Sequence, residues 1–150
     1  MDSSDAATPR LFDFGGSLRR ERFFWEARAR GLAEVEVACA DAGLSDAYAG
    51  AIPAQLVLLC GVFGNVSDAD VERTIGALPE LCAPSGVVIW TRHRRHPDLT
   101  PQIRRRLAAA GFAEEAFVSP GPDGWSVGAH RFGGQPRPLR PGRRLFNFVR

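Results

Sequence analysis

The chain has 150 residues, which suits one globular domain, and 45% of them are apolar while 24% are charged. Its apolar runs fall well short of the roughly 18 residues that cross a bilayer, and residues 1–9 lack the apolar centre of a secretory signal. These features exclude collagen-like, membrane-spanning and wholly disordered chains. They predict a cytoplasmic protein with no membrane partner.

The basic residues are all arginine, 19 in number, and the net charge is only +2. Two clusters, Arg92 with Arg94 and Arg95, and Arg104 to Arg106, could hold phosphates, as in a nucleic-acid-binding domain. The near-neutral total and the lack of interleaved exposed aromatics favour a solvated face balanced by acids instead. A nucleic-acid partner is therefore disfavoured.

The three cysteines, Cys39, Cys60 and Cys82, lie far apart and form no CxxC pair. Any disulfide would leave one of them over, and each stands in an apolar context. We expect all three to be reduced core residues.

The N-terminal part predicts two short strands around a helix. Residues 1–16 are expected to be a flexible or short-strand segment, with Leu11 to Phe14 as the strand. Ser17 resembles an N-cap, and the apolar spacing that follows predicts a helix over residues 18–30. A second strand is predicted over residues 35–40, followed by a loop or short helix over residues 44–51.

The most hydrophobic run is Leu56 to Cys60, which does not alternate and is therefore typical of a central parallel strand covered on both faces. Ser67 predicts the cap of a helix that ends or kinks at Pro79. Another buried strand is predicted over residues 86–90, and Thr100 with Pro101 predicts the start of the next helix.

Two strands close the pattern, over residues 116–118 and 125–130, and the turn-forming residues between them predict an antiparallel hairpin. Strands and helices largely alternate before this hairpin. The sequence therefore predicts an α/β fold of Rossmann-like type. Its sheet should be open, twisted and mostly parallel, with helices on both faces and a C-terminal antiparallel hairpin.

Ligands of open α/β sheets bind outside the carboxyl ends of the strands. That rule selects residues 41–43, 60–65 and 91–94, which offer a carboxylate at Asp41, a glycine-containing turn and an imidazole at His93. His93 is a candidate proton acceptor. His93 and His96 have a spacing that can hold a metal, but the arginines between them and the lack of a third ligand predict none.

Five segments carry a family resemblance: Asp41 to Tyr48, Leu56 to Asn65, Ile89 to Arg95, Pro97 to Thr100, and Arg144 to Phe146. In order and spacing they resemble the C-terminal part of a class I S-adenosylmethionine-dependent methyltransferase of a type common in actinobacteria. The resemblance covers about four-fifths of the chain. It implies S-adenosylmethionine as cofactor and a partial methyltransferase domain over residues 17–150.

The resemblance also implies roles for single residues. Asp41 would face the adenine amino group, and Ala42 would offer its N–H to the ring. The cofactor's methionine part would lie over Cys60, Gly61, Val62 and Phe63. From the residues alone, Asp41 can also be a turn or cap residue, and Gly61 and Gly64 can mark an ordinary tight turn.

Residues 1–35 lack the glycine-rich GxGxG loop with which such enzymes begin, so the chain resembles an enzyme truncated on its N-terminal side. Asp13 could imitate the acid that binds the ribose. Without the first strand, the flank of residues 56–60 has no neighbour. Residues 35–40, residues 11–14 or another chain could fill the place, and a homodimer through the exposed sheet edge is one outcome.

The resemblance implies an enzyme that transfers a methyl group to a small-molecule acceptor, with activity in question because the glycine-rich loop is missing. The alternative is a non-catalytic remnant of the same fold that acts as a binding or dimerisation module.

Overall fold

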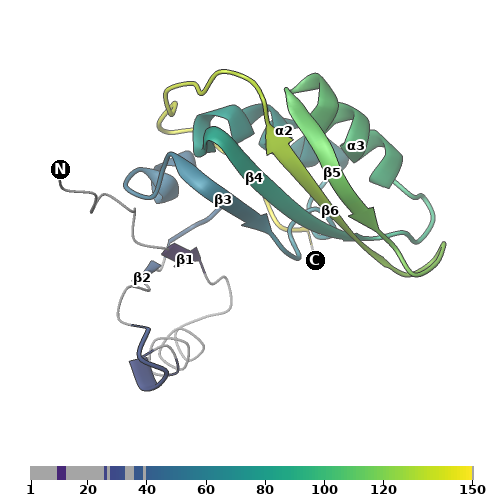
Figure 1. Ribbon diagram of the computed structural model, residues 1–150, viewed down its shortest axis with the longest axis horizontal. Helices are drawn as coiled ribbons and strands as arrows, with labels where there is room; N and C mark the ends of the chain where they lie inside the picture. Colours follow the sequence, from purple (N-terminus) through teal and green to yellow (C-terminus); the bar gives the residue numbers. More distant parts are fainter. Residues whose placement is uncertain (1–9, 13–25, 27, 33–35, 39, 150) are drawn as a thin grey trace.

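A computed structural model describes residues 10–12, 26, 28–32, 36–38 and 40–149 (Figure 1). Its elements in chain order are β1 (Arg10–Phe12), β2 (Glu36–Ala38), a short 3-10 helix (Ser45–Tyr48), β3 (Ala54–Leu59), α2 (Asp68–Leu81), β4 (Cys82–His93), α3 (Thr100–Ala109), β5 (Phe112–Val118) and β6 (Trp125–Phe132). The expected helix over residues 18–30 falls mostly outside the described residues. No helix among those described is long and apolar enough to cross a membrane.

The main sheet has four strands in the order β3-β4-β6-β5. β3 and β4 run parallel, whereas β6 pairs antiparallel with both β4 and β5. The α/β class and the C-terminal hairpin are confirmed. The expectation of a mostly parallel sheet is wrong for this part of the chain, because the hairpin inserts β6 between β4 and β5 and makes the sheet mixed.

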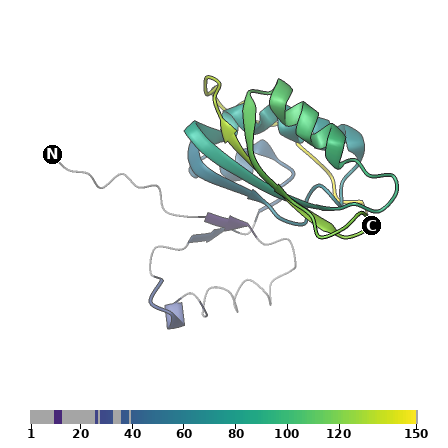
Figure 2. The ribbon, with the colours of Figure 1, turned by 45° about the vertical axis from the view of Figure 1, so that its right-hand side comes forward.

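Helices α2 and α3 both lie against the same face of this sheet (Figures 1 and 2). Ser67 caps α2 as expected, since its side chain accepts a hydrogen bond from the backbone N–H of Asp70. The helix continues through Pro79 to Leu81, where buried side chains hold its last turn. The expected cover of helices on both faces is not seen among the described elements.

The core lies between the sheet and these two helices. Its largest fully buried apolar side chains come from the turn after β3, from β4, from both helices, from β5 and from the C-terminal segment: Trp90, Phe63, Phe112, Ile75, Leu78, Ile103, Leu107 and Leu145. Gly128 of β6 leaves room for the indole of Trp90, because a Cβ there would lie 2.6 Å from Trp90 Cζ2. Packing at this density fixes the strand ends relative to the helices.

β3 does not lie in the environment that its sequence predicts. It is an edge strand of the main sheet, and Leu56 and Leu58 are 52% and 57% exposed. Only Leu59 of this strand is buried. The prediction of a central strand covered on both faces is therefore wrong here, because no described strand lies on its outer edge and neither α2 nor α3 covers the face of the two leucines.

The strands β1 and β2 form a separate parallel pair, with Leu11 opposite Val37. Neither strand pairs with β3.

The cysteines differ in their exposure. Cys82 is a buried free thiol, as expected. Cys60 is exposed, one residue beyond β3, so the prediction that it is a core residue is wrong. Cys39 lies outside the described residues.

Candidate functional site

The turn that follows β3 is fixed against the end of β4. The backbone N–H of Gly61 donates to Thr91 Oγ1 at 3.0 Å, and Asn65 Nδ2 donates to the Gly61 carbonyl at 2.7 Å. Arg92 donates through Nη1 to the carbonyl of Phe63. These bonds hold residues 60–65 beside residues 91–93, so two of the three segments selected from the sequence meet at one edge of the sheet.

The four candidate residues of this turn differ in exposure. Cys60 and Gly61 face solvent, whereas Val62 and Phe63 are buried, with Phe63 packed 6.1 Å from the Trp90 ring. Gly61 has a φ of +72° and nothing within 4 Å of the position of a Cβ. A ligand can therefore approach the backbone of this turn from the side of Cys60 and Gly61.

Asp41 lies in the loop that follows β2 and makes a local turn, because its Oδ1 accepts from the N–H of Gly43 at 2.8 Å. Its Oδ2 lies 2.6 Å from Arg144 Nη1. The hydrogen bonds from Arg144 and Gly43 lower the pKa of Asp41. The carboxylate is 53% exposed, so an anionic acceptor stands open to solvent at this position.

Ala42 is fully buried, and its carbonyl accepts from the hydroxyl of Tyr48 at 2.7 Å. Burial, together with the charge of Asp41, raises the pKa of Tyr48 to about 12, so this hydroxyl stays a donor at neutral pH. No surface of Ala42 reaches solvent. A ligand that bound its N–H would have to displace the residues packed over it.

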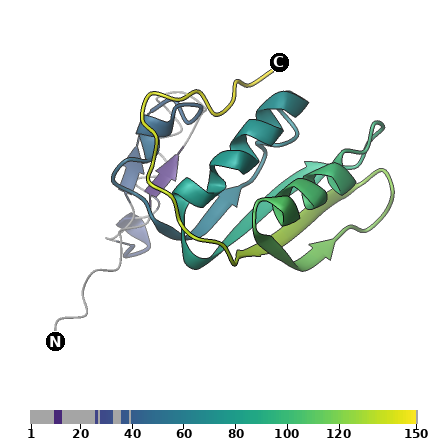
Figure 3. The same cartoon turned by 90° about the horizontal axis from the view of Figure 1, so that it is seen from above.

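The C-terminal segment, residues 133–149, contacts both the Asp41 loop and the turn that follows β3. The N–H of Leu145 donates to Gly43 at 2.7 Å, and the N–H of Val149 donates to Asn65 at 2.8 Å. Four residues of extended chain span at most about 14 Å, so Gly43 and Asn65 lie at the same end of the molecule. Figure 3 shows this segment returning along the helix side toward its terminus. Asp41 and Cys60 therefore do not lie at opposite ends.

Gly43 is required by this arrangement. A Cβ at this position would collide with the carbonyl of Phe146 and would lie 2.7 Å from Arg144 Nη1. The segment thus packs directly on the loop that carries Asp41. Sequence reasoning included Arg144 to Phe146 in the family resemblance but missed their contact with Asp41, since nothing in the local spacing indicates a partner so far along the chain.

His93 is exposed at the end of β4, and its register partner on β6 is Trp125, which is 56% exposed. The nearest atom of His93 would lie 3.6 Å from a Cβ on Gly64. An imidazole thus stands beside the turn that follows β3, and the exposed indole of Trp125 lies opposite it on β6. Asp13, the remaining candidate, lies outside the described residues.

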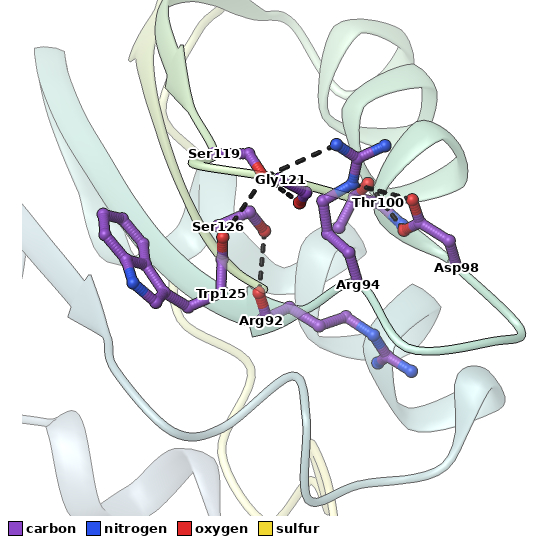
Figure 4. Close-up of polar contacts among 8 residues, drawn as sticks. All are labelled: Arg92, Arg94, Asp98, Thr100, Ser119, Gly121, Trp125 and Ser126. Atoms are coloured by element: carbon purple, nitrogen blue, oxygen red, sulfur yellow. Dashed lines mark hydrogen bonds and ion pairs between the residues drawn. The ribbon is translucent and has the colours of Figure 1, made fainter. Parts of the chain in front are cut away.

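The arginines near this end bond within the chain (Figure 4). Arg94 Nε lies 2.9 Å from Asp98 Oδ2, and its Nη1 lies 3.4 Å from Ser119 Oγ. The carbonyl of Arg92 accepts from Ser126 Oγ at 2.7 Å. In the second cluster, Arg104 pairs with Glu114 and Arg106 with Glu72. These contacts engage Arg94 of the first cluster and Arg104 and Arg106 of the second within the chain. Within the part of the chain that the structure describes, no three His, Cys, Asp or Glu side chains gather as a metal site.

No protein-family model and no curated protein matches the chain. Solved structures do match. One is an O-methyltransferase family protein from Burkholderia thailandensis, 18% identical, with a TM-score of 0.65 over 83% of this chain and 43% of that one. The chain shares the fold of the matched part of this protein.

Two further matches are proteins with different reactions. The N-methyltransferase NodS from Bradyrhizobium japonicum, in complex with S-adenosyl-L-homocysteine, is 15% identical with a TM-score of 0.54 over 83% of this chain and 66% of that one. The [4+2]-cyclase SpnF is 14% identical with a TM-score of 0.60 over 82% and 65%. At these identities the match establishes the fold alone, and one fold hosts different reactions.

The chain spans 43% to 66% of the length of these three structures. Much of each matched protein therefore has no counterpart in these 150 residues. The structural match therefore does not show that this chain has the activity of those whole proteins.

Proposed function

We propose that the chain binds S-adenosylmethionine at the carboxyl ends of its strands and takes part in methyl transfer to a small-molecule acceptor. The observation that carries this proposal is the shared position of the Asp41 loop and the turn after β3, joined by the C-terminal segment within a methyltransferase fold. In open α/β sheets this end of the strands is where ligands bind.

Asp41 would accept a hydrogen bond from the adenine amino group. A carboxylate offers about four lone-pair sites, of which Gly43 and Arg144 occupy two, so the residue retains acceptor capacity. Cys60 and Gly61 would lie beside the methionine part, since their side of the turn is open. The buried Ala42 fits less well and would need local opening before its N–H reached an adenine ring.

The bound cofactor supplies an electrophilic methyl group on a sulfonium. The chain's own contribution is to hold the acceptor in line with that methyl group, which accounts for much of the rate of such reactions. His93, exposed beside Trp125, would accept the proton that a hydroxyl or amine acceptor releases, and the indole would offer a flat apolar surface to the acceptor.

Isothermal calorimetry with S-adenosylmethionine and S-adenosyl-L-homocysteine tests the proposal. We expect saturable heat, and we expect Asp41→Ala to weaken binding about tenfold or more, as for the loss of a hydrogen bond to a charged group. Asp123→Ala, in the exposed turn between β5 and β6, is the matched control and should bind like the wild type. Absence of heat at millimolar ligand would contradict cofactor binding by this chain.

A non-catalytic remnant is the second candidate. The observation that favours it is the exposed apolar edge strand β3, with Leu56 and Leu58 more than half exposed, which suits a binding or dimerisation module. Such a protein would keep the fold but would bind neither S-adenosylmethionine nor S-adenosyl-L-homocysteine. Calorimetry without heat, together with a cooperative unfolding transition, would support it.

A further inference from the structure

One face of the main sheet is apolar from one edge strand to the other. Side chains alternate along a strand, and Val88 and Trp90 of β4 are fully buried on the side of α2 and α3 (Figures 1 and 2). Their neighbours along β4 therefore point to the opposite side, which we call the open face. Register partners share a face, so the open face continues onto β3, β6 and β5. Its apolar residues include Leu56, Leu58, Ile89, Ala129, Ala116 and Val118.

The open face is exposed at both edges of the sheet. Leu56 and Leu58 are 52% and 57% exposed on β3, and Val118 is 55% exposed on β5. Trp125, at the strand end, is 56% exposed, and Figure 4 shows its indole pointing away from the side chain of Arg94. The other exposed large apolar residues in the described part of the chain lie outside the main sheet, at Leu32, Phe148 and Val149. An exposed apolar surface gathered on one face marks an interaction site.

The open face carries little charge, and its charges are balanced. Among the outward positions of the four described strands, the arginine is Arg131, whose Nε and Nη2 both donate to Glu115. The polar groups farther along are Thr91, whose hydroxyl accepts from Gly61, and His93 at the strand end. An anionic lipid surface would require a rim of unpaired basic residues, which this face does not offer. Two copies of a face without net charge can meet without repulsion between like charges.

The two halves of the open face differ in the size of their side chains. The half formed by β3 and β4 carries Leu56, Leu58 and Ile89. Between Trp125 and Arg131 at its two ends, the half formed by β6 and β5 carries only alanine and valine. The strand order β3-β4-β6-β5 gives each half two strands. A two-fold axis parallel to the strands would therefore lay the large side chains of each copy on the small ones of the other, as in a well-packed core.

We propose that the open face is the interface of a two-fold homodimer in which the sheets of two copies pack face to face. β3 of one copy lies across β5 of the other, and β4 lies across β6. Sheets packed in this way are about 10 Å apart, with their strands within about 30° of each other. Both copies use the same patch, so the patch must fit itself in shape and charge. His93 and Trp125 lie at the rim of the contact, at the strand end.

The open face is large enough for this contact. With strands about 4.8 Å apart and a rise of about 3.3 Å per residue, four strands paired over residues 87–93 of β4 give a flat face of roughly 20 Å by 23 Å. Two copies bring together on the order of 900 Å² of flat area. Protruding side chains add accessible surface to this, and specific interfaces bury about 1,200 Å² or more. The size therefore suits a dimer of modest, micromolar affinity.

Sedimentation equilibrium of the 150-residue chain without cofactor, from low to high micromolar concentration, tests the proposal. We expect a monomer–dimer equilibrium. Leu58→Glu and Val118→Glu, at opposite edges of the open face, should each weaken the dimer about tenfold or more, because each places a charge in an apolar contact. Val149→Glu is the matched control, since Val149 is 56% exposed and lies outside the sheet, and it should leave the equilibrium unchanged. Thermal unfolding shows whether the three variants fold.

Ala116→Trp tests the fit of large side chains against small ones. Ala116 is exposed on β5, so the monomer has room for a larger residue. In the proposed contact the indole would collide with the leucines of β3 in the second copy, and the dimer should weaken about tenfold or more. Association driven by apolar surface without a defined fit would become stronger instead.

The proposal is overturned if the chain stays monomeric over this concentration range, if Ala116→Trp strengthens the dimer, or if neither glutamate variant weakens it. Dissociation by Leu58→Glu but not by Val118→Glu would assign the contact to the β3 edge alone, as in the edge-paired dimer expected from the sequence. A monomeric chain that sediments with vesicles of phosphatidylcholine and phosphatidylserine would assign the face to a lipid surface. None of these results bears on S-adenosylmethionine binding, which calorimetry measures separately.

Discussion

Arg144 Nη1 lies 2.6 Å from Asp41 Oδ2, although the two residues are 103 positions apart in the chain. This ion pair ties the C-terminal segment to the loop after β2, at the end of the strands where a ligand would bind. The acid to which the family resemblance assigns the adenine contact therefore already has a cationic partner within the protein.

Removal of that partner should raise the pKa of Asp41. The Arg144 hydrogen bond is the largest cause of the lowered pKa, so Arg144→Gln should move the pKa of Asp41 back toward its ordinary value of 3.8. NMR titration of the Asp41 carboxyl carbon measures the change. Arg131→Gln, whose guanidinium contacts Glu115 on β5 instead, should leave the Asp41 titration as it is. An unchanged Asp41 pKa in Arg144→Gln would show that the pair does not form in solution.

Glu80 anchors the C-terminal segment on α2. Its side chain is 1% exposed, and its Oε1 accepts from Arg140 Nη2 at 2.9 Å and lies 3.2 Å from Arg143 Nη1. Burial alone would raise the pKa of Glu80, but the hydrogen bonds from Arg140 and the charges of Arg143 and Arg140 outweigh it and hold the pKa low. The side chain is therefore ionised at neutral pH.

Glu80→Gln should lower the free energy of unfolding by about 2 kcal/mol, the contribution of hydrogen bonds to a buried charged group. Urea denaturation measures this. The matched control is Glu115→Gln, which breaks the exposed Arg131 pair and should change the free energy by less than about 1 kcal/mol. Equal effects of the two substitutions would mean that Glu80 is not the anchor.

The contact of Gly128 with Trp90 leaves no room for a side chain. Gly128→Ala should lower the free energy of unfolding by about 1–3 kcal/mol, because the new methyl group would overlap the indole. Gly76→Ala is the control, since nothing lies within 4 Å of its Cβ position in α2. It should stabilise the protein by about 0.5–1 kcal/mol through helix propensity. A neutral Gly128→Ala would contradict the described packing.

His130 makes stability depend on pH. Burial is the main cause that lowers the pKa of His130 below 6.5, with the charge of Glu114 raising it and that of Arg104 lowering it. Trp90 Nε1 donates to His130 Nδ1 at 3.3 Å, which suits the neutral ring. The unfolded chain takes up a proton near pH 6.5 and the folded chain resists it. The stabilising contribution is therefore present above pH 6.5 and is lost as the pH falls.

Urea midpoints at pH 7.5 and pH 5.5 measure this loss, which has a limiting slope of about 1.4 kcal/mol per pH unit for one proton. His130→Gln removes the titrating group and should flatten the dependence. The lowered pKa of Glu114 keeps that acid charged across this range. A pH dependence that His130→Gln leaves unchanged would assign it to other groups.

Local patterns in the sequence predicted local structure well. The cap at Ser67 and the hairpin of β5 and β6 follow from residues close to each other in the chain, and both are confirmed. The apolar run in β3 correctly indicated a strand. It could not indicate what lies beside that strand, because periodicity records the chemistry of a segment and not the presence of its neighbours.

At the candidate site, too, the sequence predicted local features but not contacts between distant residues. The rule that ligands bind at strand ends selected the loops at Asp41 and Cys60, and the structure places both at one end of the molecule. The ion pair with Arg144 and the close packing on Gly43 depend on the C-terminal segment, which returns from about 100 residues away. No spacing rule along the sequence reports such a contact.

The central claim is that these two loops form one nucleoside site. An NMR titration of the 15N-labelled chain with S-adenosyl-L-homocysteine tests it most directly. The account predicts amide shifts at residues 41–43 and 60–63 that saturate together with a single Kd. Shifts confined to another face, or a spectrum unchanged at millimolar ligand, would contradict it.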